Sequence, residues 1–189
     1  MWPTTPAERH RTAAATFGDR VRGVADWDAP TPVEEWRARD VVRHLLEWLP
    51  GFLEGGSDAR LSPVPVADDE LSSSWGTRAA EVQHLLDERG DAPYTSRMFG
   101  ELTVAEALDR FYVADVVMHT WDLARATGQD DRLDPEFCAQ AFAGMDPMAD
   151  MLAASGQYGP RVPVPDDADV QDRLIGLIGR DPHWRPPGR

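Results

Sequence analysis

The sequence predicts an all-α fold, most simply a four-helix bundle with additional helices at its C-terminal end. Apolar residues recur at helical spacing in several segments, which proline- and glycine-rich connections separate. No segment shows convincing alternation of apolar and polar residues, and no internal repeat is evident. The 189 residues suit one domain over residues 1–189, with residues 155–189 packed on the bundle as an extension.

The composition is that of an acidic protein whose basic residues are all arginine. The formal net charge is −14, from 33 acidic and 19 basic residues. Such a chain, without basic runs, is a poor candidate for binding nucleic acid or an anionic membrane. No apolar run has the length of a membrane span, and no signal peptide is recognisable, so we expect a cytoplasmic protein. The single cysteine, Cys138, excludes an internal disulfide and a cysteine-built zinc site.

The start of the first helix is predicted by its N-terminal residues. Thr5, Pro6 and Glu8 stand at the N-cap, at the first turn and at the capping-box position. The helix that follows is expected to end near Trp27. We interpret His10, which lies between two arginines in the first turns, as a solvent-exposed surface residue.

The second helix follows Trp36 and is expected to stop at Gly55-Gly56. Its apolar residues cover a broad arc, made by Val41, Val42, Leu45, Leu46, Leu49, Phe52 and Leu53. His44 lies at the edge of this arc, next to Trp48. A lone histidine at such an edge is usually an ordinary helical residue, so the helix alone does not make it a metal ligand.

A long connection over residues 56–68 contains too much proline for a helix. Extended, it reaches about 40 Å, which exceeds the length of a 20-residue helix at about 30 Å. It can therefore cross the height of a bundle and leave the second helix parallel to a third, over residues 69–89. His84 lies off the apolar stripe of that third helix and is interpreted as a structural surface residue.

The longest predicted helix, of about 24 residues, organises the chain. Thr103 and Glu106 form a capping box at its start, and Gly128 stops it. Its apolar face is made by Val104, Leu108, Phe111, Tyr112 and Met118. Asp115 and His119 lie in the middle of this face, where an unpaired carboxylate would cost several kcal/mol. The two residues are one turn apart, so either a metal ion or a purely structural hydrogen bond satisfies both.

The C-terminal third predicts two further helices. Tyr94 and Phe99 are expected in a loop over the core before the central helix. Asp134-Pro135-Glu136 begins a fifth helix, and a short helix is expected around residues 168–179. The fifth helix should turn its apolar residues inward, namely Phe137, Ala141, Met145, Met148 and Leu152.

Acid-x3-His spacing places two metal ligands on one helix face. A third ligand from a facing helix can then complete the set of ligands on one side of a metal ion. His44 is the natural third ligand, because no other histidine is better placed. Asp122 and Arg125 lie on the same helix; they either support the ligands or form an ordinary ion pair. Phosphate loops, the Gly-x-Ser-x-Gly elbow and the His-Glu-x-x-His motif are missing.

Three segments in order resemble one protein family over nearly the whole chain. Residues 35–45, EWRARDVVRHL, and residues 117–128, VMHTWDLARATG, are similar to two signatures of actinobacterial DinB-like metal-binding proteins. These are related to the N-terminal domain of mycothiol-dependent maleylpyruvate isomerase. The tail is similar to the C-terminus of the family at residues 158–165, 172–174 and 179–182.

The resemblance implies a DinB-type four-helix bundle that binds a divalent metal, usually Zn²⁺ or another such as Ni²⁺. Position by position, the implied ligands are His44, Asp115 and His119. Two departures are Val33, where relatives often have a cysteine, and Arg37, where a threonine cap is common. The sequence also lacks a counterpart of the separate C-terminal domain of the isomerase, so that specific isomerase activity is not expected.

The leading functional hypothesis is a zinc-dependent transferase or isomerase-like enzyme that uses a small thiol, with mycothiol as the cosubstrate implied by the family. The thiolate would attack a small electrophile. No catalytic acid or base is assigned. The alternatives are a metal-binding or sensing protein without turnover, and a metal-free bundle in which Asp115 and His119 pair. The sequence is compatible with a homodimer.

Overall fold

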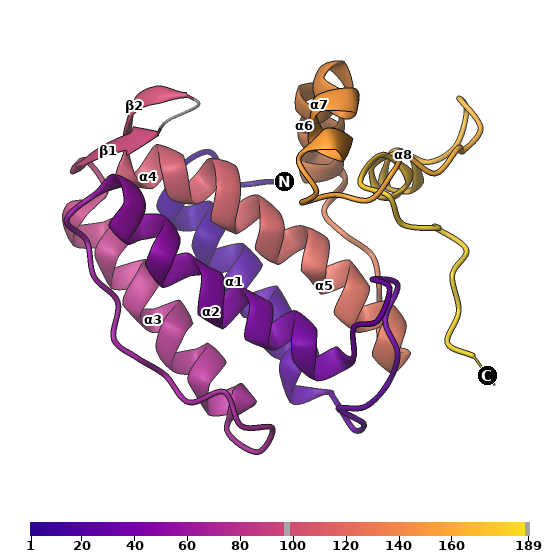
Figure 1. Cartoon of the computed structure of the whole chain (residues 1–189), viewed down its shortest axis with the longest axis horizontal. Coiled ribbons are helices and arrows are strands. Elements are labelled where there is room, and N and C mark those ends of the chain that lie inside the picture. The colour runs from indigo at the N-terminus through magenta and orange to yellow at the C-terminus, as the bar shows by residue number, and fades with distance from the viewer. Residues whose placement is uncertain (97–98, 188–189) are drawn as a thin grey trace.

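Four helical segments pack as a bundle and form the body of the protein (Figure 1). The computed structural model describes residues 1–96 and 99–187. Three segments are single helices, and the fourth is a continuous run of α4, a π-helical segment η1 and α5. The bounds are Pro6–Arg22 for α1, Ala38–Gly56 for α2, Leu71–Arg89 for α3, Val104–Ala107 for α4, Leu108–Val113 for η1 and Ala114–Thr127 for α5. The predicted all-α, DinB-type bundle is confirmed.

The core lies between these four segments and is filled from all of them. Its largest fully buried apolar side chains include Phe17, Leu45, Leu49, Leu71, Tyr112 and Trp121. Burying a side chain of this kind contributes about 1.5–3 kcal/mol. The bundle therefore holds its helices, and whatever side chains they carry at their edges, in fixed relative positions.

α2 and α3 run in the same direction, as the long connection between them predicts (Figure 1). The connection returns along the outside of the bundle and is fastened to α2. Arg43 donates from Nε to the Val66 carbonyl at 3.0 Å, and its Nη2 contacts Asp68 at 2.7 Å. Arg39 contacts the other oxygen of Asp68 at 2.6 Å.

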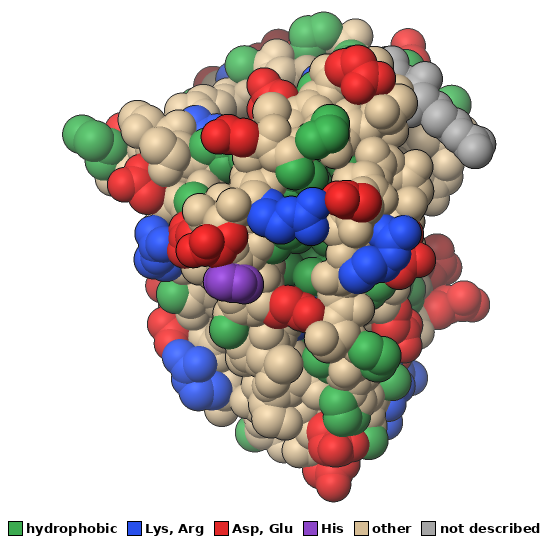
Figure 2. All heavy atoms as spheres, turned by 90° about the vertical axis from the view of Figure 1, so that its left-hand side faces the viewer, with side chains coloured by type: hydrophobic (Ala, Val, Ile, Leu, Met, Phe, Trp, Pro, Cys, Tyr) green, Lys and Arg blue, Asp and Glu red, His purple; other side chains and the backbone are tan. Residues whose placement is uncertain are grey.

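The face seen in Figure 2 mixes acidic and basic side chains rather than gathering arginines into one patch.

The fourth segment begins as predicted but is not α-helical throughout. Thr103 Oγ1 accepts the backbone N–H of Glu106 at 3.1 Å, and the Glu106 carboxylate accepts that of Thr103 at 2.7 Å. The π turn at residues 108–113 inserts extra chain into the helix and rotates the faces beyond it. Phe111, which a regular helix would bury, is therefore only partly buried, whereas Val113 is buried.

A small hairpin precedes α4, and the expectation of no strand is wrong here. β1, Pro93–Ser96, pairs antiparallel with β2, Gly100–Thr103. Strands of four residues are too short for alternation to be visible in sequence. Tyr94 is buried over the core as predicted, and its hydroxyl donates to the Phe52 carbonyl at 3.0 Å.

α1 ends at Arg22, earlier than the predicted end near Trp27. The helix stops where the side chain of Gln129 approaches the backbone at Gly23, a position where a Cβ would collide with that amide. Gln129 Nε2 donates to the Arg20 carbonyl at 2.8 Å and so satisfies a group left open by the last turn.

His10 is buried, so its interpretation as a surface residue is wrong. Its side chain lies between α1 and α3, where Nδ1 is 2.8 Å from Gln83 Oε1, and its ring stacks on Tyr112 with centroids 6.2 Å apart. The flanking arginines indicate a solvent-exposed helix face, but α3 packs on the side of α1 that carries His10.

The C-terminal third packs beside α5 (Figure 1). Its elements are α6 (Pro135–Met145), the short 3-10 turn η2 (Asp146–Met148), α7 (Ala149–Ala154) and α8 (Val170–Leu177). The predicted fifth helix is broken at η2, because Pro147 has no N–H to continue the helical hydrogen bonds. Burial raises the pKa of the Cys138 thiol to about 12, so this cysteine is not a thiolate at neutral pH. Among the described helices, none is long and apolar enough to cross a membrane.

Candidate metal centre

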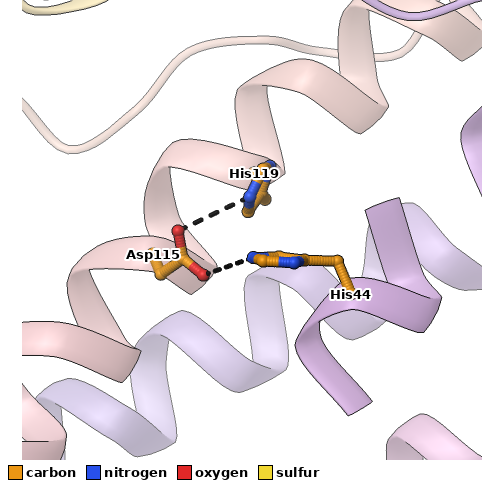
Figure 3. Close-up of side chains that lie close together, drawn as sticks. All are labelled: His44, Asp115 and His119. Carbon is orange, nitrogen blue, oxygen red and sulfur yellow. Dashed lines mark hydrogen bonds and ion pairs between the residues drawn. The ribbon is translucent and has the colours of Figure 1, made fainter. Parts of the chain in front are cut away.

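Three side chains from two facing helices converge at one point between α2 and α5 (Figure 3). His44 comes from α2, and Asp115 and His119 come from successive turns of α5. His44 Nε2 lies 3.1 Å from Asp115 Oδ2, and His119 Nε2 lies 3.5 Å from Asp115 Oδ1. The structure thus brings together all three residues that the sequence singles out as ligands.

The cluster is open on one side. The side chain of His44 is 33% exposed, that of Asp115 19% and that of His119 only 6%. His44 therefore lies nearest the surface, and His119 lies deepest.

Asp115 is held by several donors at once. Besides the two imidazoles, Trp48 Nε1 donates to Asp115 Oδ2 at 3.1 Å. Burial alone would raise the pKa of Asp115, but neighbouring His119, together with His44 and Trp48, outweighs burial and lowers the pKa below its ordinary value. Asp115 is therefore a carboxylate at neutral pH.

His119 is oriented by a second carboxylate behind it. Its Nδ1 lies 2.9 Å from Asp122 Oδ2, and Asp122 is fully buried. An Nδ1–H that donates to Asp122 leaves the lone pair of Nε2 directed toward Asp115, where a metal would bind. Burial by itself would lower the pKa of His119, but Asp115 and Asp122 outweigh it and raise the pKa above its usual value. In the metal-free protein these carboxylates favour a proton on the imidazole, and a divalent cation would take that place.

Asp122 is itself paired with Arg180 from the C-terminal tail. Arg180 Nη2 lies 3.3 Å from Asp122 Oδ2 and its Nε lies 3.5 Å from Oδ1. Of the two sequence-based alternatives for Asp122, the structure shows support of His119. The alternative ion pair with Arg125 is not formed; Arg125 donates instead to the Pro182 carbonyl at 2.8 Å.

Two tryptophans enclose the cluster. The Trp36 ring lies 5.1 Å from the His44 ring and 5.6 Å from the His119 ring, nearly parallel to the latter at 20°. Trp36 is presented by a tight bend in which the preceding Glu35 has φ 64°, a left-handed conformation unusual for a residue other than glycine. The Trp48 ring, 6.1 Å from the His44 ring, adds a second aromatic wall.

Tyr158, in the segment after α7, contributes a further titratable side chain. Burial first, and then the charge of Asp115, raise the pKa of its hydroxyl to about 12, while Arg180 acts in the opposite direction. The phenol therefore stays protonated at neutral pH. Sequence reasoning assigned no role to Tyr158, Arg180, Trp36 or Trp48, although each belongs to a segment that resembles the family or flanks it.

The spacing of the three ligand residues fits a divalent metal. Around a tetrahedral zinc with ligands at about 2.0–2.2 Å, neighbouring ligand atoms are about 3.4 Å apart. The imidazole-to-carboxylate separations, 3.1 Å to Oδ2 and 3.5 Å to Oδ1, are close to this value, and one ligand atom from each residue lies within 4.8 Å of the other two. The group can therefore hold a metal ion. The other histidines predicted to be non-ligands lie elsewhere: His10 is between α1 and α3, and His84 is exposed on α3.

Comparison with known families adds to this geometry. A family model described as the mycothiol maleylpyruvate isomerase N-terminal domain matches residues 10–124. The chain belongs to this family. As a member of the mycothiol maleylpyruvate isomerase N-terminal domain family, it carries His44, Asp115, His119 and Asp122 inside the matched stretch. Tyr158, Arg180 and the helices α6 to α8 lie outside it.

Two relatives of the chain come from Mycobacterium tuberculosis. The proteins come from two strains, and each is 27% identical to this chain over 182 residues. The aligned region covers 93% of this chain and 97% of either relative. Both are described as uncharacterized. No solved structure matches the chain.

Proposed function

We propose that the protein binds one divalent metal ion, zinc, through His44, Asp115 and His119, and uses it to activate a small thiol, mycothiol, for reaction with a small electrophile. The observation that carries the proposal is the position of the Asp115 carboxylate between two imidazole Nε2 atoms, 3.1 and 3.5 Å away. Membership of a family whose model is named for a mycothiol isomerase supports the choice of thiol. Nickel is the alternative metal.

Counting ligands points to a reactive rather than a structural centre. Structural zinc sites are almost always closed by four protein ligands, and catalytic ones keep a position open. Among the described residues, the candidate cluster contains only His44, Asp115 and His119. Bound zinc would supply a Lewis-acid position at which an incoming thiol is stable as a thiolate at neutral pH.

The surrounding residues have separate tasks in this proposal. Asp122 holds the ring of His119, so that Nε2 keeps its direction. Trp36 and Trp48 exclude water from two sides and leave the approach past His44 open. The protonated hydroxyl of Tyr158 can donate a hydrogen bond to a substrate atom that gains negative charge. In a transfer reaction the new sulfur–carbon bond forms as the leaving group departs with its electron pair, and the thiol proton goes to solvent.

The test begins with metal content. Protein purified without a histidine tag should carry about one zinc or similar ion per chain by elemental analysis. If the protein has no stoichiometric metal and gains no thermal stability from added zinc or nickel, the proposal fails at its first step. The metal-free bundle then takes its place.

The thiol is tested on cobalt-substituted protein. Adding mycothiol should produce a sulfur-to-cobalt charge-transfer absorption, and binding should strengthen from about pH 6 toward the free thiol pKa of about 8.5, because less work is then needed to remove the proton. Asp115→Ala should not give the band. An unchanged spectrum at saturating mycothiol, with cobalt bound, would overturn the thiol function and leave a metal-binding protein without turnover.

A further inference from the structure

A cavity of about 330 Å³ lies between the fourth bundle segment and the α6–α7 region, which stand side by side in Figure 1. Pockets for small ligands are usually about 300–1,000 Å³, so it suits a small molecule. Its walls are mainly apolar and include Phe111, Met118, Ala141, Met145, Met148 and Leu152. Trp2 and Phe137, which also line the cavity, pack edge to face with ring centroids 5.2 Å apart.

The charged groups of the cavity favour one negative charge in the ligand. Arg9 is neutralised by Asp109, whose carboxylate lies 2.7 Å from Arg9 Nη1. Arg110 is different: its guanidinium lies over the Phe99 ring, 3.9 Å from the centroid, and no carboxylate of residues 1–96 or 99–187 pairs with it. An unpaired cation beside an apolar wall, in a chain of net charge −14, is a site for an anion with an apolar body.

The cavity adjoins the metal centre through the helix that they share. Ala114 and Met118 line the cavity, and they directly precede Asp115 and His119 in α5. Tyr158 lines the cavity as well. A ligand in the cavity therefore lies against the face of α5 next to the one that carries the candidate metal ligands.

We infer that this cavity binds a small organic acid with an apolar, aromatic-sized body and a single carboxylate, which Arg110 holds. That this acid is the electrophile of the thiol reaction rests on the function proposed above. The binding itself does not, since neither metal nor thiol takes part in it. Dicarboxylates fit less well, because Arg110 is the one cation among the described lining residues that has no carboxylate partner, and Asp109 adds a negative charge to the same walls.

The experiment uses the methionines, of which Met118, Met145 and Met148 line the cavity, whereas Met1 and Met151 are exposed outside it. In protein labelled with ¹³C at the methionine methyl groups, trans-cinnamate should shift the three cavity signals and leave those of Met1 and Met151 in place. From the size of cinnamate we expect a dissociation constant of about a millimolar or tighter. Cinnamyl alcohol, which lacks the charge, and maleate, which lacks the apolar body and carries two charges, should bind at least about fivefold more weakly.

The variant Arg110→Gln should weaken cinnamate binding about tenfold and leave cinnamyl alcohol unaffected. Arg132→Gln is the matched control, because Arg132 is exposed outside the cavity. The inference is overturned if cinnamate shifts no cavity methionine, if Arg110→Gln binds it as the unaltered protein does, or if maleate binds as tightly. Cinnamate binding without a cobalt–thiol band would refute only the proposed function, and a cobalt–thiol band without cinnamate binding would refute only this inference.

Discussion

His119 Nδ1 and Asp122 Oδ2 form a hydrogen bond of 2.9 Å that is almost completely shielded from solvent, with side-chain exposures of 6% and 1%. A buried carboxylate is stable only with partners, and Asp122 has two, His119 in front and Arg180 behind. The ring of His119 is thereby fixed from the side opposite the candidate metal position. The C-terminal tail contributes to the centre through this chain of contacts, although it contributes no ligand.

Removing the carboxylate behind His119 should weaken metal binding without removing a ligand. We expect Asp122→Asn to lower zinc affinity about 10–100-fold, because the amide no longer fixes the tautomer and orientation of the imidazole. Competition with a chromophoric chelator measures the affinity. An Asp122→Asn protein with unaltered zinc affinity would contradict the orienting role.

Arg180→Met should destabilise the metal-free fold by about 3 kcal/mol, because it leaves the buried charge of Asp122 without its cation. Urea unfolding in the presence of EDTA measures the loss. Arg185→Met is a control in the same tail, since Arg185 is exposed and contacts only backbone carbonyls near it. Equal losses in the two variants would show that the Asp122 pair is not the cause.

The choice of ligands can be tested histidine by histidine. His44→Ala should lower zinc affinity more than about 100-fold, since it removes a ligand rather than a support. His84→Ala, on the exposed side of α3, should not change it. Isothermal titration with zinc separates the two. Equal affinities in both variants would place the metal elsewhere. His10→Ala is unsuitable as a control, because His10 is buried.

The bundle and the convergence of three candidate ligands could be predicted because both depend on local pattern. Helical spacing, capping residues and the length of the second connection determine which segments are helices and how they run. A carboxylate and a histidine one turn apart on an apolar face are visible in the sequence itself, and the family resemblance supplies the facing His44.

The remaining features depend on contacts between distant segments. Arg180 pairs with Asp122 although the two are 58 residues apart in the sequence, and the local sequence around neither residue predicts this contact. The π turn before Asp115 reflects how the helix is accommodated in the bundle, and helical periodicity assumes that no such turn exists. The burial of His10 follows from where α3 packs, which its arginine neighbours do not reveal.

Trp48 should act both as a support of Asp115 and as a reporter of metal. Bound Ni²⁺ or Co²⁺ near Trp36 and Trp48 should quench tryptophan fluorescence, and Zn²⁺ should quench it much less. Trp48→Phe keeps the aromatic wall but removes the 3.1 Å hydrogen bond to Asp115, so we expect metal affinity to fall by up to about tenfold. Fluorescence titration measures both effects. An unchanged affinity would show that the carboxylate is held well enough by the imidazoles alone.

The pH dependence of stability should report the burial of His10. Burial lowers the pKa of His10 below 6.5, and the hydrogen bond that Gln83 Oε1 accepts from the imidazole only partly compensates. As the pH falls below about 6.5, His10 therefore becomes protonated in the unfolded chain but stays neutral in the folded protein. The free energy of unfolding decreases over this range, until the pH reaches the pKa of His10 in the folded protein. His119 acts in the opposite sense in the metal-free protein: its pKa is raised, so its contribution is present below about 6.5 and lost as the pH rises.

Comparison with His10→Leu isolates the effect of His10, because His119 is common to both proteins. Urea unfolding in EDTA between pH 5 and 7.5 should show that the stability of His10→Leu, relative to the unaltered protein, improves as the pH is lowered. A constant difference between the two proteins across this range would mean that His10 titrates alike in the folded and unfolded states, which its position between α1 and α3 does not allow.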